Sequence, residues 1–228
     1  MISIISSVYN SEKYLDLYLD MINSQFSECF EIVFVDANSQ DKSLEIISNF
    51  KFKENIKTKI ISQNKNLTIY EAWNLAIKNS TGKYVLNWNT DDSLFPSAIK
   101  TYEDYARKYS DIDLFYGPCF TSKNQGFESP SNILIWPNYS HEVLLTRCIC
   151  GPFPLVKKSA IEKVGYFSEK YVSSGDYDMW LKLSKSNFKF KKIPEIVGCF
   201  LDRPDSISKE KIHLAQKEDR EIQNKYSH

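Results

Sequence analysis

Residues 1–36, MISIISSVYNSEKYLDLYLDMINSQFSECFEIVFVD, contain a β-branched segment, an amphipathic segment and a second apolar segment that ends in an aspartate. Residues 1–8 have no helical period and predict a buried strand. Ser11 fits the N-cap of a helix whose apolar residues lie on one face. Residues 30–36 predict a second buried strand. Strand, helix and strand in this order are typical of a βαβ unit with parallel strands.

The same alternation continues along the chain. After residue 36 the pattern predicts three helix–strand pairs in order, over residues 38–50, 58–63, 68–80, 82–88, 93–109 and 112–120. The second half of the sequence is less regular. Its pattern predicts a mobile loop over residues 121–132, then a strand with a short helix ended by a glycine over residues 151–167. An amphipathic helix over residues 175–188, one or two strands over residues 190–201 and a charged helical tail from Ser206 follow. No repeat and no linker is visible, so we expect one α/β domain with a decorated second half.

The composition of the 228 residues is that of an ordinary globular protein, with 42% hydrophobic and 25% charged residues. Lys plus Arg and Asp plus Glu both number 29, and the formal net charge of zero disfavours a sequence-independent nucleic-acid binder. The five cysteines are scattered and odd in number, which favours neither a disulfide framework nor a zinc site. No apolar run approaches the ~20 residues of a membrane-spanning helix. We expect a cytoplasmic protein and leave open a peripheral association with a membrane.

Polar residues follow three of the predicted strands where each strand ends. Ser7 and Tyr9 close the first strand, Asp36 closes the second, and Asp91 and Asp92 follow the fourth. Ligands of such sheets bind beyond the carboxyl ends of the strands. The sequence therefore predicts a ligand site at this edge of the sheet, with three carboxylates on its rim.

The adjacent Asp91 and Asp92 are compatible with three uses. They could cap the following helix, or act as an acid/base dyad, although neighbouring residues of a strand point to opposite faces. They could also bind Mg²⁺, which takes one or two carboxylates and completes its shell with water and phosphate oxygens. The glycine-rich loops G-x-G-x-x-G and G-x-x-x-x-G-K-[ST] are absent, which excludes dehydrogenases and P-loop proteins. A cation bound to Asp92 would hold phosphate in place of a glycine-rich loop.

Four segments, in this order, resemble the catalytic domain of family 2 glycosyltransferases, which have the GT-A fold. They are ISIISSVYNSEKYL (2–15), FVDANSQDKSLEII (34–47), NKNLTIYEAWNLAIKNSTGKYVLNWNTDDSLFP (64–96) and GPFPLVKKSAIEKVGYFSEKYVSSGDYDMWLKL (151–183). The resemblance covers residues 1–205. It implies a mostly parallel, Rossmann-like central sheet flanked by helices, an irregular acceptor-side second half and a C-terminal helix. The implied units are a nucleotide-sugar-binding half, an acceptor-binding half and a helical tail, over residues 1–120, 121–205 and 206–228.

The resemblance also implies roles for single residues. The nucleotide would be bound by Ser7, Tyr9, Asp36, Asn66 and Asp91. Asp92, with Asp91, would bind Mn²⁺ or Mg²⁺. Asp176 would be the general base of an inverting transfer, in which it takes the proton of the attacking acceptor hydroxyl. Trp136 and Asp178 are weaker candidates for contact with the acceptor. Trp73 and Trp180 are predicted to belong to the core.

The implied activity is a metal-dependent, inverting transfer of one sugar from a nucleotide-diphosphate sugar to a hydroxyl of a saccharide or other acceptor. UDP is the commonest nucleotide of the resembling family, and the synthesis of glycans or surface polysaccharides is the expected context. The Q-x-x-R-W signature of processive synthases is missing, which favours single additions. Whether His213 or Arg203 contacts the metal or the diphosphate stays open, as does a homo-oligomer formed through the charged C-terminal helix.

Several positions depart from the family pattern, namely Ala37, Leu67, Thr68 and Gly175, the last in place of an acid that often precedes the base. These departures leave open a catalytically inactive relative that binds nucleotide sugars or acts as a scaffold. A sugar nucleotidyltransferase is a third possibility. It would need a first loop rich in Gly and in Arg or Lys, whereas SSVYNSEKY contains only Lys13.

Overall fold

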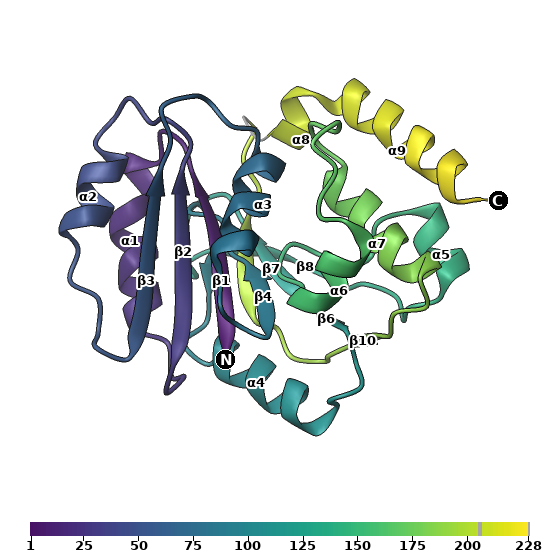
Figure 1. The fold of residues 1–228 in the computed structure, drawn as a ribbon, viewed down its shortest axis with the longest axis horizontal. Helices are drawn as coiled ribbons and strands as arrows, with labels where there is room; N and C mark the ends of the chain where they lie inside the picture. The colour runs from purple at the N-terminus through teal and green to yellow at the C-terminus, as the bar shows by residue number, and fades with distance from the viewer. Residues whose placement is uncertain (205–206, 228) are drawn as a thin grey trace.

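The computed structural model describes residues 1–204 and 207–227, which form two sheets and the helices packed around them (Figure 1). The strands are β1 Ile2–Val8, β2 Phe30–Asp36, β3 Ile56–Ser62, β4 Tyr84–Asn87, β5 Ser93–Leu94, β6 Leu114–Tyr116, β7 Cys119–Ser122, β8 Pro130–Leu134, β9 Leu155–Lys157, β10 Phe190–Lys192 and β11 Gly198–Leu201. The helices are α1 Glu12–Asn23, α2 Ser43–Asn49, α3 Ile69–Asn79, α4 Ala98–Lys108, α5 His141–Thr146, α6 Lys158–Val164, α7 Gly175–Lys185, α8 Ile207–Glu210 and α9 Ile212–Tyr226.

The larger sheet has seven strands in the order β10-β6-β9-β4-β1-β2-β3. All of its pairings are parallel except those of β9, which runs antiparallel to β4 and β6. The register places Val8 beside Asp36, so the first two strands end at the same edge. The prediction of a mostly parallel central sheet flanked by helices is confirmed.

Both faces of strands β1 and β2 are buried, whereas the edge strand β3 is largely exposed. Ile4 of β1 points into a core cluster with α1 and α4, whereas Ile5 points into a second cluster with α3 and α7. The buried Ser3 and Ser6 form hydrogen bonds with Glu31 and Tyr18. A strand covered on both sides favours apolar side chains on both faces, as at Ile2, Ile4, Ile5 and Val8. Burying each such side chain contributes about 1.5–3 kcal/mol. The layers of the core hold the strand ends, and with them the candidate site, in fixed positions.

A small second sheet, β5-β11-β7-β8, was not predicted. The helix predicted for residues 93–109 begins only at Ala98, because Ser93 and Leu94 pair with β11 as strand β5. The strand predicted for residues 112–120 is interrupted at Gly117 and Pro118, and its two parts belong to different sheets. Pro118 cannot donate to a ladder, and a Cβ on Gly117 would lie 2.7 Å from a side-chain carbon of Ile193.

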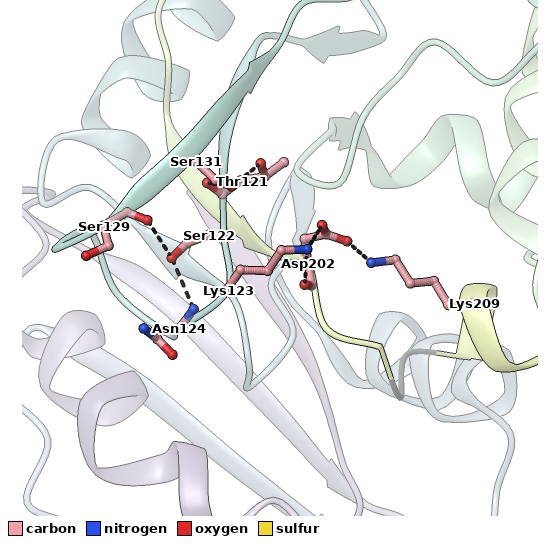
Figure 2. A network of polar contacts seen from close by, with 8 residues as sticks. All are labelled: Thr121, Ser122, Lys123, Asn124, Ser129, Ser131, Asp202 and Lys209. Carbon is pink, nitrogen blue, oxygen red and sulfur yellow. Dashed lines mark hydrogen bonds and ion pairs between the residues drawn. The ribbon is translucent and has the colours of Figure 1, made fainter.

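The mobile loop predicted for residues 121–132 is largely a hairpin of β7 and β8 (Figure 2). The hydroxyls of Thr121 and Ser131 are 3.1 Å apart, and the Ser122 hydroxyl donates to the backbone oxygen of Ser129 at 3.2 Å. These contacts join the two strands across the hairpin. The acceptor-side half is therefore less irregular than its composition indicates, because β7 pairs with β8 and also with the distant β11.

The C-terminal segment is helical, as predicted, although Ser206 and His228 lie outside the described residues. Helix α9 contributes Ile222 and Tyr226 to the core cluster that contains Trp180. The five cysteines are free thiols. Within residues 1–204 and 207–227, no helix has both the length and the apolar character needed to cross a membrane. The division of the chain at residue 205 stays a prediction.

Candidate active site

A cavity of about 300 Å³ lies between the end of β4 and the start of α7. Asp92 and Asp176 both line it, together with Trp73, Trp136, Trp180 and Phe200. The two carboxylates come from distant parts of the sequence, and the fold brings them to one cavity. A larger depression of about 630 Å³ is lined by Tyr139, His141 and Ser184 and lies at the opposite end of α7 from Asp176. The smaller cavity is the candidate active site because it contains the two predicted carboxylates.

Asp92 is buried, with an exposed fraction of 2%. Its Oδ1 accepts a hydrogen bond from the Leu201 N–H of β11 at 2.9 Å. Burial raises the pKa of Asp92 well above its usual value and the neighbouring Asp91 raises it further, while the Leu201 N–H and Arg203 act in the opposite direction. A carboxylate held in this way needs a positive charge to stay ionised.

The helix-cap and dyad interpretations of the aspartate pair do not fit this geometry. Helix α4 begins at Ala98, so neither carboxylate is at its N-cap. Asp91 Oδ2 lies 3.2 Å from the Nε of Arg203, whereas Asp92 binds the backbone of Leu201. The two side chains thus have separate partners. Binding of a cation, which would in turn hold phosphate, is the use that the surroundings favour.

Arg203 is held beside Asp91 by the residues around it. Its Nη1 donates to the Tyr14 hydroxyl at 3.1 Å. The preceding residue, Asp202, forms ion pairs with Lys123 of the hairpin, at 2.5 Å, and with Lys209 of α8 (Figure 2). Asp202 therefore anchors the chain where it leaves the small sheet. The guanidinium consequently lies at the aspartate pair, where it could also meet a diphosphate.

The predicted nucleotide-binding residues lie along the ends of β1, β2 and β3. Asp36 is buried and accepts a weak hydrogen bond from the Ser39 N–H at 3.3 Å. Asn38 Nδ2 donates to Asn66 Oδ1 at 2.9 Å and so joins the loops after β2 and β3. At the end of β1, Ser7 is half-buried and Tyr9 is 49% exposed. These residues share one edge of the sheet, and their contact with a nucleotide stays a prediction.

Ser11 occupies the N-cap position of α1, as predicted, but its side chain does not cap the helix. The Thr90 hydroxyl donates to Ser11 Oγ at 3.0 Å, and the Ser11 N–H donates to Ser43 Oγ at 2.8 Å. The loops after β1, β2 and β4 are thereby linked through one residue. This link stiffens the rim on which Asp36 and Asp92 lie.

Asp176 lies in the first turn of α7, half-buried, with its carboxylate near the hydroxyl of Tyr70 at 3.4 Å. The pKa of Asp176 is raised to about 6, mainly by burial and to a lesser extent by the negative charge of Asp219. The backbone N–H groups of Tyr177 and of Asp176 itself, and the Tyr70 hydroxyl, lower the pKa in part. A carboxyl that ionises near neutral pH is suited to act as a general base. Tyr70 was not identified from the sequence as part of the site.

Two of the departures from the family pattern have local explanations. Thr68 is the N-cap of α3 and forms a capping box with Glu71, in which the Thr68 N–H donates to the Glu71 carboxylate at 2.7 Å. A Cβ on Gly175 would lie 2.7 Å from a ring carbon of Tyr70. The ring of Tyr70 therefore occupies the space that a side chain at position 175 would need. Thr68 begins the helix that carries Tyr70 to this position.

Asp178 has a structural role, which contradicts the prediction that it contacts the acceptor. Its side chain is fully buried. Its carboxylate accepts hydrogen bonds from Lys225 at 2.7 Å and from Tyr226 at 3.0 Å, and lies 3.2 Å from Lys182. Residues two apart on a helix point about 200° apart, so Asp178 faces α9 while Asp176 faces the cavity.

Three tryptophans line the cavity. Trp73 and Trp180 are buried in the core, as predicted, and each also contributes to the cavity wall. Trp136, the predicted acceptor contact, is half-buried there. Among the described residues, the indole N–H groups of all three have no hydrogen-bond partner.

The carboxylates at the rim suit a divalent cation. Asp92 and Asp91 offer hard oxygen ligands, and Mg²⁺ ordinarily takes one or two carboxylates with water and phosphate oxygens. The donor set therefore fits Mg²⁺ or Mn²⁺ bound together with a diphosphate. In the described part of the chain, no group of three or more His, Cys, Asp and Glu side chains could hold a metal ion by itself. His213 is exposed on α9 and does not line the cavity.

Comparison with known proteins agrees with this arrangement. A family model described as "Glycosyl transferase family 2" matches residues 3–165. Chondroitin synthase from Escherichia coli is 30% identical over 200 residues, which cover 86% of this chain and 28% of the synthase. The chain thus spans less than a third of the length of that relative.

Two solved structures show the fold. S. aureus TarS 1–349 in complex with UDP has a TM-score of 0.74 at 18% identity, with 99% of this chain and 70% of that chain covered. The mannosyltransferase PcManGT from Pyrobaculum calidifontis, in complex with GDP-Man and Mn²⁺, has a TM-score of 0.68 at 16% identity and covers 96% of this chain and 60% of that one. The family match ends before α7, so Asp176 and α9 lie beyond it.

Proposed function

The chain belongs to glycosyl transferase family 2, and from this premise we propose that it transfers one sugar, with inversion, from a nucleotide-diphosphate sugar to an acceptor hydroxyl. The observation that carries the proposal is the cavity of about 300 Å³ that Asp92 and Asp176 share. One carboxylate is placed to serve the leaving diphosphate and the other to serve the attacking hydroxyl. The family includes polysaccharide synthases, and a saccharide acceptor is consistent with the tryptophan-lined wall.

In the proposed reaction, Asp176 accepts the proton of the acceptor hydroxyl. The acceptor oxygen forms a bond to the anomeric carbon, and the bond from this carbon to the diphosphate breaks, so that its electron pair leaves with the nucleotide diphosphate. A direct displacement of this kind inverts the configuration at the anomeric carbon. Because the pKa of Asp176 is about 6, the carboxyl is largely ionised at neutral pH and basic enough to take the proton.

In the proposal, the donor nucleotide binds at the ends of β1, β2 and β3, beside the cavity and outside its lining. Asp36 and Asn66 would contact the nucleoside, with Ser7 and Tyr9 at the end of β1 beside Asp36. A divalent cation on Asp92, with Asp91, would supply positive charge against the leaving diphosphate. UDP is the preferred nucleotide of the proposal because TarS, which shares the fold, forms a complex with UDP. PcManGT, in complex with GDP-Man and Mn²⁺, makes GDP the alternative.

The environment of Gly175 supports an active enzyme over an inactive relative. The missing acid before the base was the reason to consider an inactive protein. The ring of Tyr70 fills that space, and the Tyr70 hydroxyl approaches the Asp176 carboxylate. The missing acid is thus accommodated by the packing of Tyr70, whose hydroxyl donates its proton to the Ser173 oxygen and so holds the turn before the base.

Calorimetric titration with UDP, GDP and dTDP, with and without Mn²⁺, tests the proposal. We expect one nucleotide to bind at least tenfold more tightly with the metal than without it, because the metal would link Asp92 to the diphosphate. The preferred nucleotide then identifies the sugar donors to test in a transfer assay. Failure of all three nucleotides to bind under both conditions would contradict the proposal.

The pH dependence of kcat/KM should report the ionisation of Asp176. The carboxyl is active as a base when ionised, so kcat/KM should fall roughly tenfold per pH unit below about pH 6. Asp219 contributes to the raised pKa of Asp176, and Asp219→Asn should therefore move this acidic limb of the pH profile of kcat/KM to lower pH. Glu210→Gln, which removes an exposed carboxylate of α8, should leave the limb in place. A kcat/KM that does not fall below about pH 6 in the wild type would show that Asp176 is not the titrating base.

A further inference from the structure

Helix α9 packs against α7 near the C-terminal end of the chain (Figure 1). Its buried residues are Glu218, Ile222 and Tyr226, four residues apart. Ile222 and Tyr226 are part of the core, whereas Glu218 places a carboxylate in the same interface with an exposed fraction of 6%. A buried carboxylate is costly unless hydrogen bonds compensate it. The position of Glu218 therefore requires strong partners.

Those partners are three consecutive peptide groups directly before α7. One carboxylate oxygen of Glu218 accepts from the N–H of Val172 at 2.8 Å. The other accepts from Ser173 at 2.9 Å and from Ser174 at 3.0 Å. Hydrogen bonds to an ionised acceptor are about twice as strong as neutral ones. Glu218 thereby fixes residues 172–174, and Asp176 follows only two residues later.

Tyr70 of α3 holds the same segment from another side. Its hydroxyl donates to the backbone oxygen of Ser173 at 2.8 Å and accepts from the Gly175 N–H at 2.8 Å. The turn that carries Asp176 is thus held between the C-terminal helix and the N-terminal half of the chain. Neither Glu218 nor its three amide partners line the cavity.

We propose, on the basis of the proposed function, that Glu218 is a positioning residue, which holds residues 172–174 so that the Asp176 carboxylate meets the acceptor hydroxyl. Glu218 lies outside residues 3–165, so the match to the family does not assign it a role. A displacement of about 1 Å in an active site can lower the rate about 10²-fold. Because Glu218 serves the base and not the donor, its loss lowers kcat and leaves nucleotide affinity unchanged.

Glu218→Gln tests the proposal with almost no change in volume. The amide has one acceptor oxygen, so its NH₂ group would face at least one of the three N–H donors. We expect kcat to fall by roughly 10- to 100-fold, with donor KM and the calorimetric affinity for the nucleotide unchanged. Glu221→Gln is the matched control, because Glu221 lies on the same helix and pairs with Lys170 on the surface, where such pairs contribute little. Its kcat should equal that of the wild type.

Unchanged kcat in a folded Glu218→Gln protein, or an equal loss of kcat and nucleotide affinity, would overturn the positioning role. If the variant does not fold, Glu218→Asp replaces it: the charge stays but the reach is one methylene shorter, and wild-type kcat in this protein would overturn the role. Wild-type turnover is measured first, since its absence refutes the proposed function instead. If the wild type shows no turnover, amide hydrogen exchange tests the positioning role of Glu218 separately. Glu218→Gln should still speed the exchange of the amides of residues 172–174, and unchanged exchange would refute the role.

Discussion

Asp176→Asn should lower kcat by about 10²- to 10⁴-fold, the contribution expected of a general base. The amide keeps the shape of the side chain but cannot take the proton of the acceptor hydroxyl. Nucleotide affinity should change little, because Asp36 and Asn66 lie outside the cavity that Asp176 lines, and Asp92 binds the metal in the proposal. Steady-state kinetics with a nucleotide sugar, together with calorimetry of the nucleotide, measure the two effects separately.

The matched control for this variant is Asp16→Asn, which removes an exposed carboxylate of α1 and should have wild-type kinetics. Asp178→Asn gives a second comparison. Its main effect should be on thermal stability, because Asp178 is buried and binds Lys225 and Tyr226. Retained turnover in Asp176→Asn would place the base elsewhere. Parallel losses of kcat and nucleotide affinity would show that Asp176 also holds the donor.

Asp92→Asn should abolish the metal-dependent part of nucleotide binding, with a loss of roughly 100-fold or more in affinity and a similar loss in turnover. Loss of a residue that only supports a metal ligand already costs 10- to 100-fold, and loss of the ligand itself costs more. The neutral amide can still accept the hydrogen bond of the Leu201 N–H, which is 2.9 Å from Oδ1 in the wild type. Calorimetry with and without Mn²⁺ measures the effect.

The fold of this variant should be intact. Replacing a buried carboxylate by an amide avoids the cost of burying a charge, so thermal unfolding of the metal-free protein at pH 7 should occur at or above the wild-type temperature. Asp91→Asn provides the comparison at the neighbouring position, where the carboxylate pairs with Arg203. Metal-dependent affinity that survives in Asp92→Asn but is lost in Asp91→Asn would make Asp91 the principal ligand.

The central sheet could be predicted because its signals are local. The segment that ends in Asp36 has its own apolar run, and α3 has its own capping residue, Thr68. The small sheet could not be predicted in this way. Ser93 and Leu94 become a strand only because β11, far along the chain, is beside them. The break at Pro118, by contrast, follows from the missing N–H and could have been predicted.

Some residues of the candidate site could likewise be predicted from the sequence, and others could not. Asp92 and Asp176 could be proposed from motifs, and the structure brings them to one cavity. Helical periodicity alone could have placed Asp178 on the opposite face from Asp176. Glu218 could not be identified, because α9 is rich in charged residues and no pattern marks one carboxylate as buried. Its role depends on the packing of α9 against residues 172–174, which is a tertiary contact.

The close approach of Tyr70 to Gly175 has a consequence for reading other members of the family. A side chain at position 175 cannot coexist with the tyrosine ring, since its Cβ would lie 2.7 Å from a ring carbon. Relatives with a larger residue at the position that corresponds to Gly175 therefore need a smaller one at the position that corresponds to Tyr70. These two positions, 105 residues apart, should vary together during evolution. Their joint identity would separate the members that orient the base through a tyrosine from those that use a neighbouring acid.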